Sequence, residues 1–414
     1  MDQHSPRADS ARVDPLPSAR APSSHPVPAW LRERLRQAGG WVSFRTYMEW
    51  ALHDPQHGAY GSGRLRIGPR GDFATAPSLS ADFAELLAPQ LAQWLEQLVR
   101  PEDPAPLALV ETGPGEGTLA LQLAEALMRD RADLAGRLEL LLIEPNPGMA
   151  ARQRQLLRSC PLPVRWSDFD ALAKAPRRGV VIAHEVLDAL AVERIQWDGQ
   201  RWRRQGVALA GPGLVLEAGA PVTAGEEATL AALGLARPDR TRPAGWCTEL
   251  HPGLGPWLTA CGRGCPEGFL LVIDYALEAR RYYAPARSDG TLLAYRGQRM
   301  SGDPLLEPGQ WDLTAHLCLE ALERAAALSG WSWLGQRRQG EALLALGLAE
   351  RLHDLQHRAS PRELPDLLAR REAMLRLVDP AGLGEFRWIA LARRLTSAVD
   401  TRPPPLPLFL REPA

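Results

Sequence analysis

Short apolar runs alternate with helical patterns between residues 107 and 273, and this alternation constrains the fold more than any other feature. The runs are Leu107–Val110, Leu138–Ile143, Pro163–Trp166, Gly179–Ala183 and Phe269–Ile273. Strands that are buried on both faces of a parallel sheet read as continuous apolar runs, and the helices between them form the crossovers. The sequence therefore predicts an α/β fold with a mostly parallel, Rossmann-like sheet and a terminal antiparallel element.

The flanking segments predict further elements. An Asp198-Gly199 pair between two alternating runs, Val192–Trp197 and Arg201–Gln205, predicts an inserted β-hairpin. Helices are expected at Trp30–Leu35, Phe44–Leu52, Phe83–Leu98 after an N-cap at Ser80, Leu313–Leu328 starting after Asp312, Ala342–Leu355 and Leu364–Leu377. The expected organisation is a disordered tail at 1–28, N-terminal helices and a lid loop at 29–100, a main domain at 101–400 with an insertion at about 192–265, and a loose Pro-rich tail at 401–414.

Composition argues against several classes of function. The 48 basic and 49 acidic residues nearly cancel, so nucleic acid is not an expected partner. No apolar run approaches the ~18 residues that a membrane span needs. Five cysteines do not suggest a disulfide framework, and Cys261 and Cys265 lack further metal ligands at suitable spacing. We therefore expect a cytoplasmic protein without a metal. A homodimer is possible, because the helices beyond the core carry Leu and Trp residues that are candidates for an exposed apolar surface.

A glycine-rich segment, Glu111-Thr112-Gly113-Pro114-Gly115-Glu116-Gly117-Thr118, follows the first apolar run. Glycines at a strand-to-helix turn let the chain turn sharply and let a flat ligand approach the backbone. A dinucleotide-binding loop would carry its third glycine at the position of Thr118 and no acid beside the pyrophosphate. Glu111 and Glu116 instead bracket the loop with negative charge, which favours the ammonium and sulfonium groups of S-adenosylmethionine.

Two more acids follow predicted strands. Glu144 stands after the second run, where an acid commonly accepts hydrogen bonds from both ribose hydroxyls. Asp168 follows the third run and is a candidate acceptor for the adenine amino group, although Ser167-Asp168 is equally typical of a turn. Both positions predict a nucleoside site at the carboxyl edge of the sheet.

Six motifs that occur in order along the chain resemble the MidA family. They are Gly71–Pro77, Glu111–Leu119, Glu185–Leu190, Asp274-Tyr275, Gly290–Tyr295 and Asp312–His316. The resemblance extends from about Phe44 to Leu352. The family includes the mitochondrial complex I assembly factor that acts as a protein arginine methyltransferase.

The resemblance implies a class I methyltransferase fold, S-adenosyl-L-methionine as cofactor, and symmetric dimethylation of arginine in a protein acceptor such as a complex I subunit. It implies that Gly113, Gly115, Gly117 and Thr118 line the cofactor and that Asp72 and Thr75 close over it. It also places Glu185 and Asp188 beside the methyl group, with Glu249 and His316 as an acceptor-binding acid and a candidate base.

A carboxylate pair suits an arginine acceptor. It can orient the guanidinium, bias its charge onto one nitrogen and take up the proton that is lost. If the chain begins a helix at Glu185, this residue and Asp188 share one face of it. The alternative role for both acids is that of ordinary residues in a first helical turn.

The chain departs from the family pattern at His184, Ala191, Ser78, Ala276 and Gln298. Several of these positions belong to the expected acceptor side, so a different acceptor or reduced activity stays open. The alternatives are a non-catalytic scaffold that helps a partner protein to assemble, a methyltransferase acting on a small molecule, and an NAD-dependent oxidoreductase. Thr118 and Glu111 disfavour the last of these.

Overall fold

In the computed structural model, which describes residues 25–68, 71–238, 240–357, 364–394 and 405–412, a seven-stranded sheet has the order β16-β17-β10-β5-β2-β3-β4. These strands are β2 (Leu107–Thr112), β3 (Leu138–Ile143), β4 (Val164–Ser167), β5 (Arg178–His184), β10 (Glu267–Asp274), β16 (Ser332–Arg338) and β17 (Arg387–Arg393). All neighbouring pairs from β10 to β4 are parallel, whereas β17 is antiparallel to both β10 and β16. The predicted α/β fold with a mostly parallel sheet and a terminal antiparallel element is confirmed.

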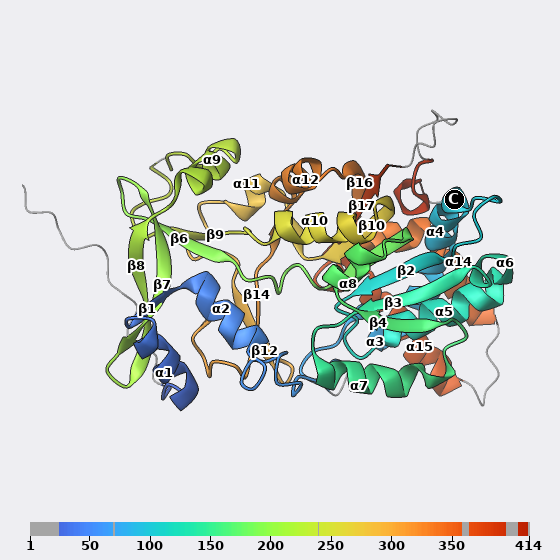
Figure 1. The fold of residues 1–414 in the computed structure, drawn as a ribbon, viewed down its shortest axis with the longest axis horizontal. Coiled ribbons are helices and arrows are strands. Elements are labelled where there is room, and N and C mark those ends of the chain that lie inside the picture. Colours follow the sequence, from blue (N-terminus) through green and yellow to red (C-terminus); the bar gives the residue numbers. More distant parts are fainter. Residues whose placement is uncertain (1–24, 69–70, 239, 358–363, 395–404, 413–414) are drawn as a thin grey trace, which may run out of the picture.

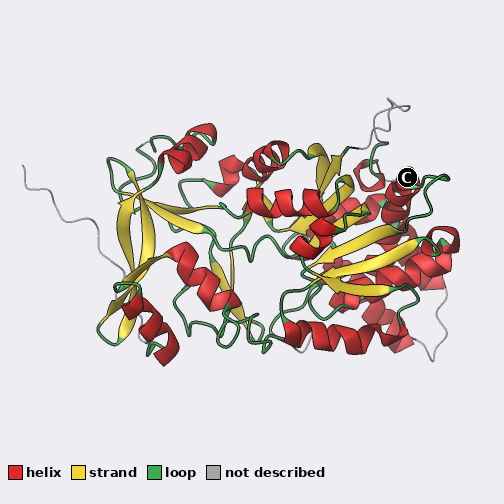
Figure 2. Cartoon of the chain, viewed as in Figure 1, coloured by secondary structure: helices red, strands yellow, loops and turns green. Residues whose placement is uncertain are grey.

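Helices cover both faces of this sheet (Figure 2). Side chains alternate across it, so that in β5 Val180 and Ile182 face one core and Val181 and Ala183 the other. The first core also contains residues of α4 (Asp82–Leu98), α5 (Thr118–Asp130), α13 (Gln339–Ala345), α14 (Leu348–His357) and α15 (Leu364–Leu377). The second contains residues of α8 (Phe169–Lys174), α10 (Leu254–Gly264) and α12 (Leu319–Leu328). The doubly covered sheet explains why its strands read as uninterrupted apolar runs.

A five-stranded antiparallel sheet lies at the opposite end of the molecule (Figure 1). It is formed by β1 (Trp41–Ser43), β6 (Glu193–Trp197), β7 (Trp202–Ala210), β8 (Gly213–Pro221) and β9 (Cys247–Leu250). The predicted hairpin at Asp198-Gly199 joins β6 to β7, and Gly199 adopts the positive φ that this turn requires. Helices α1 (Ala29–Gln37) and α2 (Phe44–His53) lie beside this sheet, and α9 (Ala224–Ala232) follows β8.

Smaller elements connect the two ends of the molecule. Strand β12 (Leu293–Arg296) pairs with both β13 (Arg299–Ser301) and β14 (Asp312–Thr314), and β11 (Ala276–Leu277) pairs with β15 (Leu317–Cys318). The remaining short helices are α3 (Ala76–Leu79), α6 (Ala132–Ala135), α7 (Pro147–Leu156) and α11 (Ala279–Tyr282), with 3-10 turns at Leu157–Ser159, Leu383–Glu385 and Leu408–Leu410. Leu292, Ala294 and Leu313 from around β12 and β14 share a core with Phe44 and Tyr47 of α2. Segments that are far apart in sequence are thereby packed into one unit beside the main sheet.

Two predicted helices were wrong in extent. The helix predicted over Leu313–Leu328 begins only at Leu319, because residues 312–314 pair with β12 and Leu317 pairs with β11. The helix predicted over Ala342–Leu355 is broken between α13 and α14 at Gly347, whose φ of +95° is incompatible with a continuing helix.

The expectation of a loose C-terminal tail was wrong for its described part, residues 405–412. Phe409 is fully buried, and its ring packs at centroid distances of 5.5 Å from Trp388 and 6.5 Å from Trp94. The aromatic side chain supplies enough apolar area to hold the segment on the sheet edge and α4. The tail predicted at 1–28 lies outside the described residues except for its last four positions.

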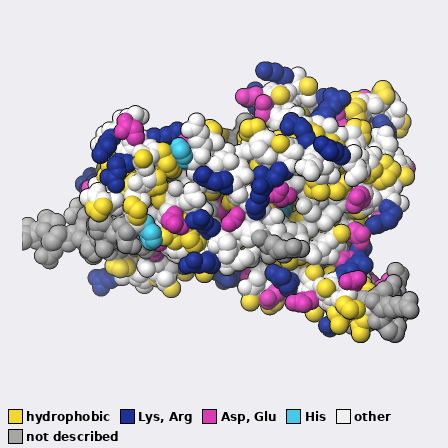
Figure 3. Space-filling view, turned by 90° about the horizontal axis from the view of Figure 1, so that it is seen from below, with side chains coloured by type: hydrophobic (Ala, Val, Ile, Leu, Met, Phe, Trp, Pro, Cys, Tyr) yellow, Lys and Arg dark blue, Asp and Glu magenta, His cyan; other side chains and the backbone are white. Residues whose placement is uncertain are grey.

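Basic and acidic side chains are interspersed on the face seen in Figure 3. Among the described helices, none is long and apolar enough to cross a membrane. Within the same part of the chain, no group of three or more His, Cys, Asp or Glu residues is arranged to hold a metal ion.

Candidate active site

A cavity of about 550 Å³ lies at the carboxyl edge of the main sheet. The ends of β2, β3 and β5 form one side of it, and the segment between α2 and α3 forms the other. Ligand pockets typically measure about 300–1,000 Å³. The size and position therefore suit a nucleoside-sized ligand at the edge where open α/β sheets bind their ligands.

The glycine loop forms the floor of this cavity, but Gly117, which was predicted to line the cofactor, is not part of the lining. Gly113, Gly115 and Gly117 all have positive φ values, of 59°, 55° and 88°, and Thr118 begins α5. A Cβ atom at Gly115 would lie 2.8 Å from Cδ1 of Ile67, and one at Gly113 would lie 3.0 Å from a methyl group of Val186. Glycine is thus favoured by the left-handed backbone conformation, and the side chains of Ile67 and Val186 pack closely against the loop.

Glu111 is buried at the end of β2, and its Oε2 atom has no hydrogen-bond partner among the described residues. Burial raises the pKa of this carboxyl to about 8, although a hydrogen bond from the Ala120 N–H acts in the opposite direction. A buried acid with a free oxygen in a cavity is suited to bind a cationic group. Glu116 differs from the expectation, because it forms an ion pair with Arg152 (Nε–Oε2, 2.9 Å).

Glu144 and Asp168 both line the cavity. Glu144 accepts hydrogen bonds from the backbone N–H of Asn146 at 2.8 Å and from Nε2 of Gln153 at 2.9 Å, and burial raises its pKa. Asp168 caps α8 by accepting from the Ala171 N–H at 2.7 Å. The turn role anticipated for Asp168 is therefore present together with its position in the cavity wall.

The loop between α2 and α3 is fastened over the cavity at several points. Arg152 donates from Nη1 to the Gly63 carbonyl at 3.0 Å, and Asn146 donates from Nδ2 to the Tyr60 carbonyl at 2.7 Å. Thr75 lines the cavity, whereas Asp72 does not. Asp72 instead accepts from the Gly297 N–H at 3.1 Å and so ties the loop to the turn between β12 and β13.

Four carboxyl groups gather beside the cavity: Asp188, Asp274 and Asp312 are buried, and the side chain of Glu185 is 12% exposed. Glu185 lines the cavity directly and keeps Oε1 without a partner among the described residues. Asp274 accepts hydrogen bonds from the N–H groups of Leu187 at 2.9 Å and Tyr275 at 2.8 Å. The segment after β5 is a turn held by Asp274 and not the helix start that we anticipated, so Glu185 and Asp188 meet through this turn.

Burial raises the pKa of all four acids, with Asp312 reaching about 7. The negative charge of Asp274 raises the pKa of both Glu185 and Asp188 further. Within the part of the chain that the structure describes, no Arg or Lys forms an ion pair with any of the four acids. His184 lies 3.6 Å from Glu185, but burial lowers the pKa of His184 to about 3 and keeps this histidine neutral. Because the acids lack a counter-ion, the cluster is suited to a cation from outside the chain.

The structure does not bring Glu249 and His316 to the cavity lining. Glu249 is fully buried in β9 and accepts hydrogen bonds from the Thr291 N–H at 3.0 Å and the Tyr282 hydroxyl at 3.1 Å. His316 lies between β14 and β15, with its ring centroid 5.4 Å from that of Tyr275, and burial lowers its pKa to about 4. Neither residue contacts the cavity directly, so the roles predicted for them at the acceptor stay predictions.

Several residues of the site went unassigned by sequence reasoning. Tyr60, Phe169 and Trp257 line the cavity, and the last two pack edge to face at a centroid distance of 6.3 Å. Asp274 and Asp312 were quoted only as parts of motifs. The position of Asp274 directly after a buried parallel strand was a usable signal, whereas Tyr60 lies in a loop whose sequence pattern carries none.

Comparisons with known proteins agree with this geometry. The model of a family described as "Putative S-adenosyl-L-methionine-dependent methyltransferase" matches residues 86–337. The protein arginine methyltransferase NDUFAF7 homolog, mitochondrial, from Drosophila melanogaster is 28% identical over 93% of this chain and 89% of its own length. The human mitochondrial protein arginine methyltransferase NDUFAF7 is 27% identical over 90% of this chain and 86% of its own.

A crystal structure gives the same result for the fold. A protein from Burkholderia thailandensis, solved with S-adenosyl-homocysteine bound, is 31% identical to this chain and superimposes with a TM-score of 0.79. The match covers 93% of this chain and 94% of that protein.

Proposed function

The chain belongs to the family of S-adenosyl-L-methionine-dependent methyltransferases whose model it matches, and on this premise we propose that it methylates the guanidinium group of an arginine in a protein acceptor. The observation that carries the proposal is the cluster of four carboxyl groups beside the cavity, three of them buried, with which no Arg or Lys of the described residues forms an ion pair. A guanidinium is a permanent cation that pairs with carboxylates in a fixed planar geometry. The names of the fly and human relatives point to the same acceptor chemistry.

The cavity residues fit the cofactor. Glu111, with an unpartnered buried oxygen among the described residues, would face a cationic group of the cofactor, and Glu144 would offer acceptors to the ribose hydroxyls at the end of β3. Gly115 lines the same cavity without a side chain to fill it. We assign Gly113, Thr118, Thr75 and Asp168 to the same binding surface. When bound, S-adenosyl-L-methionine supplies an electrophilic methyl group on a positively charged sulfur.

The acids then have two tasks. Without a bound cation the raised pKa values favour the protonated acids, and entry of a guanidinium favours their ionised forms. Formation of a new N–CH₃ bond requires that nitrogen to lose a proton, and Glu185 at the cavity wall is placed to accept it. Asp188 and Asp312 do not line the cavity, and their part is to add negative charge beside Glu185 that stabilises the bound guanidinium.

The test is methyl transfer from a donor labelled in its methyl group, with a cell extract as the source of acceptors and mass spectrometry to locate the label. The parent protein is expected to label arginine in one or a few proteins. Glu185→Gln, which removes the proton acceptor and preserves size, is expected to lower transfer by at least about 100-fold while the protein still binds S-adenosylhomocysteine. Glu323→Gln, at an exposed position on α12, is the matched control.

Label on a residue other than arginine would contradict the proposed acceptor. Absence of transfer by the parent, with an acceptor protein still captured, would favour an assembly scaffold over an enzyme.

A further inference from the structure

His184 is the last residue of β5, and together with Glu185 it lines the cofactor cavity. The residue is only 8% exposed. Its Nε2 atom is buried and has no hydrogen-bond partner among the described residues, and the same holds for Oε1 of Glu185. A buried polar atom without a partner costs free energy, and in a native structure it calls for a reason, of which a catalytic role is one.

The two unpartnered atoms lie close together. Nε2 of His184 is 3.6 Å from Oε1 of Glu185, which is slightly beyond the distance of a hydrogen bond. Hydrogen bonds between catalytic groups are often long before the substrate binds and tighten in the complex. A small movement of either side chain would therefore allow the pair to share one proton.

The surrounding elements hold both residues in place. The His184 ring packs edge to face against Phe83 of α4, with centroids 5.2 Å apart, and Phe83 is itself fully buried. Residue 184 pairs with Ile273 of β10, and the Glu185 N–H donates to the Ile273 carbonyl at 2.9 Å. The end of the sheet thus presents the imidazole and the carboxyl group to the same cavity.

The imidazole meets Glu185 as a neutral group. Burial lowers the pKa of His184 to about 3, so the ring carries no positive charge that would hold Glu185 in its ionised form. Burial and the charges of Asp274 and Asp312 raise the pKa of Glu185. A neutral imidazole has one nitrogen with a lone pair. His184 is therefore suited to accept a hydrogen bond from a protonated Glu185 and not to compete with it for the proton.

We propose that His184 is a positioning residue for methyl transfer, whose Nε2 atom accepts a hydrogen bond from Oε1 of Glu185 when that oxygen takes up the proton of the acceptor. In this step the acceptor nitrogen forms a bond to the methyl carbon, and the electron pair of the carbon–sulfur bond stays on sulfur. The proton that the nitrogen loses passes to Oε1. The inference rests on the proposed function, and it narrows the acceptor to a group whose nitrogen is deprotonated as it is methylated.

Two substitutions of similar size separate this hydrogen bond from packing. In His184→Gln the terminal amide reaches about as far as Nε2 and can accept the bond. In His184→Met a thioether, which is only a weak acceptor, fills comparable space. A role confined to packing would make the two variants alike, whereas the proposed role makes them differ.

The first measurement is the infrared carboxyl absorption of the complex with S-adenosylhomocysteine at neutral pH, which needs no acceptor. Glu185→Gln assigns the Glu185 band by removing it. The parent should show a protonated carboxyl group whose C=O stretch is lowered by the hydrogen bond. His184→Met should move this band to higher frequency, and His184→Gln should leave it near the parent's position. Absence of the band from the parent, or a band that does not move in His184→Met, would overturn the inference.

The second measurement is the rate of transfer to the acceptor protein that the parent labels in a cell extract. His184→Met should lower kcat about tenfold, as expected for one hydrogen bond that is made in the transition state. Its KM for the acceptor and its Kd for S-adenosylhomocysteine should stay within about threefold of the parent's, and His184→Gln should recover kcat to within about threefold. Equal losses of kcat in both variants, or a loss confined to KM, would leave His184 a structural residue.

The parent's own activity separates the possible failures. If the parent transfers a methyl group and His184→Met is as fast as the parent, the inference about His184 fails and the proposed function stands. If the parent labels no acceptor, the proposed function fails, and the role of His184 in methyl transfer fails with it.

Discussion

Glu185 combines an unusual backbone with an unusual side-chain environment. Its φ is +54°, in the left-handed region that non-glycine residues rarely adopt, and its carboxyl group is buried with one oxygen unpartnered among the described residues. Strain of this kind persists where the surrounding structure enforces it, and it is concentrated at functional sites. The motif around Glu185 was recognisable in the sequence, but the turn that strains it depends on Asp274, 89 positions further on.

Replacing Glu185 by glycine is therefore expected to stabilise the protein while abolishing transfer. Glycine removes both the left-handed strain and a buried acid without a counter-ion, which together are worth about 1–3 kcal/mol of unfolding free energy at pH 8. Urea unfolding measures the change. Arg394→Gly, at an exposed position with φ of +49°, relieves strain alone and should give a smaller gain; equal gains would show that the buried acid carries no penalty.

The raised pKa of Glu111 predicts that a proton is released when the cofactor binds. Its pKa of about 8 without a bound cation means that it is mostly protonated at pH 7, and a bound cation requires the ionised form. Affinity for S-adenosyl-L-methionine should accordingly fall by up to about tenfold per pH unit below pH 8. Calorimetry in two buffers of different ionisation enthalpy measures the released proton.

Glu111→Gln should bind the cofactor at least about tenfold more weakly at pH 8, and without the pH dependence. Glu125→Gln, exposed on α5, serves as the control. A pH dependence that survives in Glu111→Gln would assign the proton to another group.

At the scale of elements, the strands of the main sheet were predictable and the small strands were not. β2, β3, β5 and β10 are long apolar runs whose burial on both faces leaves a clear pattern. β12 and β14 span only four and three residues, and they become strands by pairing with each other across an intervening segment. Tertiary contacts determine which strands pair, so the local apolar pattern wrongly predicted a helix at Leu313.

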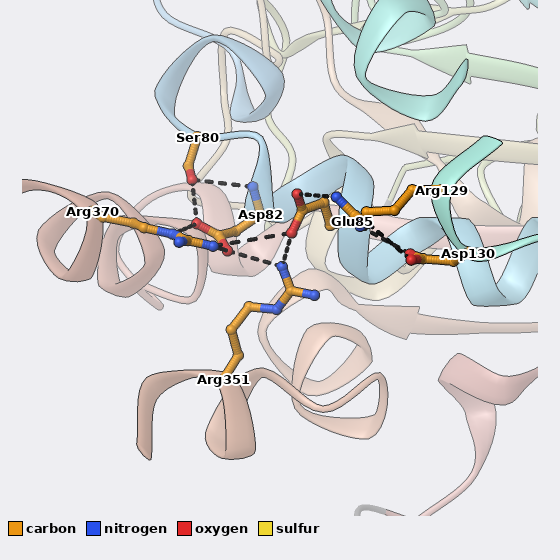
Figure 4. A network of polar contacts seen from close by, with 7 residues as sticks. All are labelled: Ser80, Asp82, Glu85, Arg129, Asp130, Arg351 and Arg370. Carbon is orange, nitrogen blue, oxygen red and sulfur yellow. Dashed lines mark hydrogen bonds and ion pairs between the residues drawn. The ribbon is translucent and has the colours of Figure 1, made fainter. Parts of the chain in front are cut away.

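Helices α14 and α15 are joined to α4 by a network of charged side chains (Figure 4). Asp82 is 1% exposed and accepts from Arg351 at 3.0 Å and Arg370 at 2.6 Å. It also accepts from the hydroxyl of Ser80, which precedes α4 by two residues and is not its N-cap as predicted, because Ala81 takes that position. Helix α3 precedes α4, and the backbone of Ala76 in α3 lowers the pKa of Glu185 against the effect of burial. The network thus supports the segment that meets the acid cluster.

Asp82→Asn should lower the free energy of unfolding by about 1–2 kcal/mol at pH 7, which lies between the costs of losing an exposed ion pair and of breaking a buried one. The pKa of Asp82 is lowered to about 2, despite burial, by its bonds to Arg370, Ser80 and Arg351. A lowered pKa contributes stability above the unfolded value near 4, and this stability is lost as pH falls from about 4 to 2. Denaturation at pH 7 and pH 2.5 should show the difference between parent and variant shrinking at the lower pH. Asp130→Asn, with a side chain 53% exposed, should have little effect at either pH.

At the scale of the whole molecule, the site lies between two packed units. The main sheet contributes Glu111, Glu144 and Glu185, and the unit built around α2 and β12–β14 contributes Tyr60 and Asp312. The sequence therefore predicted the acids that line the cavity from the main sheet, because one sheet edge assembles them from neighbouring strands. It could not predict that a loop near residue 60 meets a strand near residue 312, because no periodicity records such a contact.

The assembled acids give the whole protein a specific pH response. The pKa of Asp312 rises from its ordinary value near 4 to about 7, so its folded form binds a proton more tightly than the unfolded chain does. Its contribution is favourable below pH 4 and is lost as pH rises through 7. Asp312→Asn should therefore raise the Tm relative to the parent by about 2–5 °C more at pH 8 than at pH 5. A Tm difference that is the same at both pH values would contradict the raised pKa, and Asp133→Asn at an exposed position is the control.

The account depends most on the spatial relation between the methyl donor and the acids, and a crystal structure with S-adenosyl-L-methionine bound tests it most directly. The predicted result is a cofactor in the cavity of about 550 Å³, with its amino group near Glu111, its ribose at Glu144 and its methyl group directed toward Glu185. A cofactor bound elsewhere, or one whose methyl group points away from Glu185 and Asp312, would contradict it.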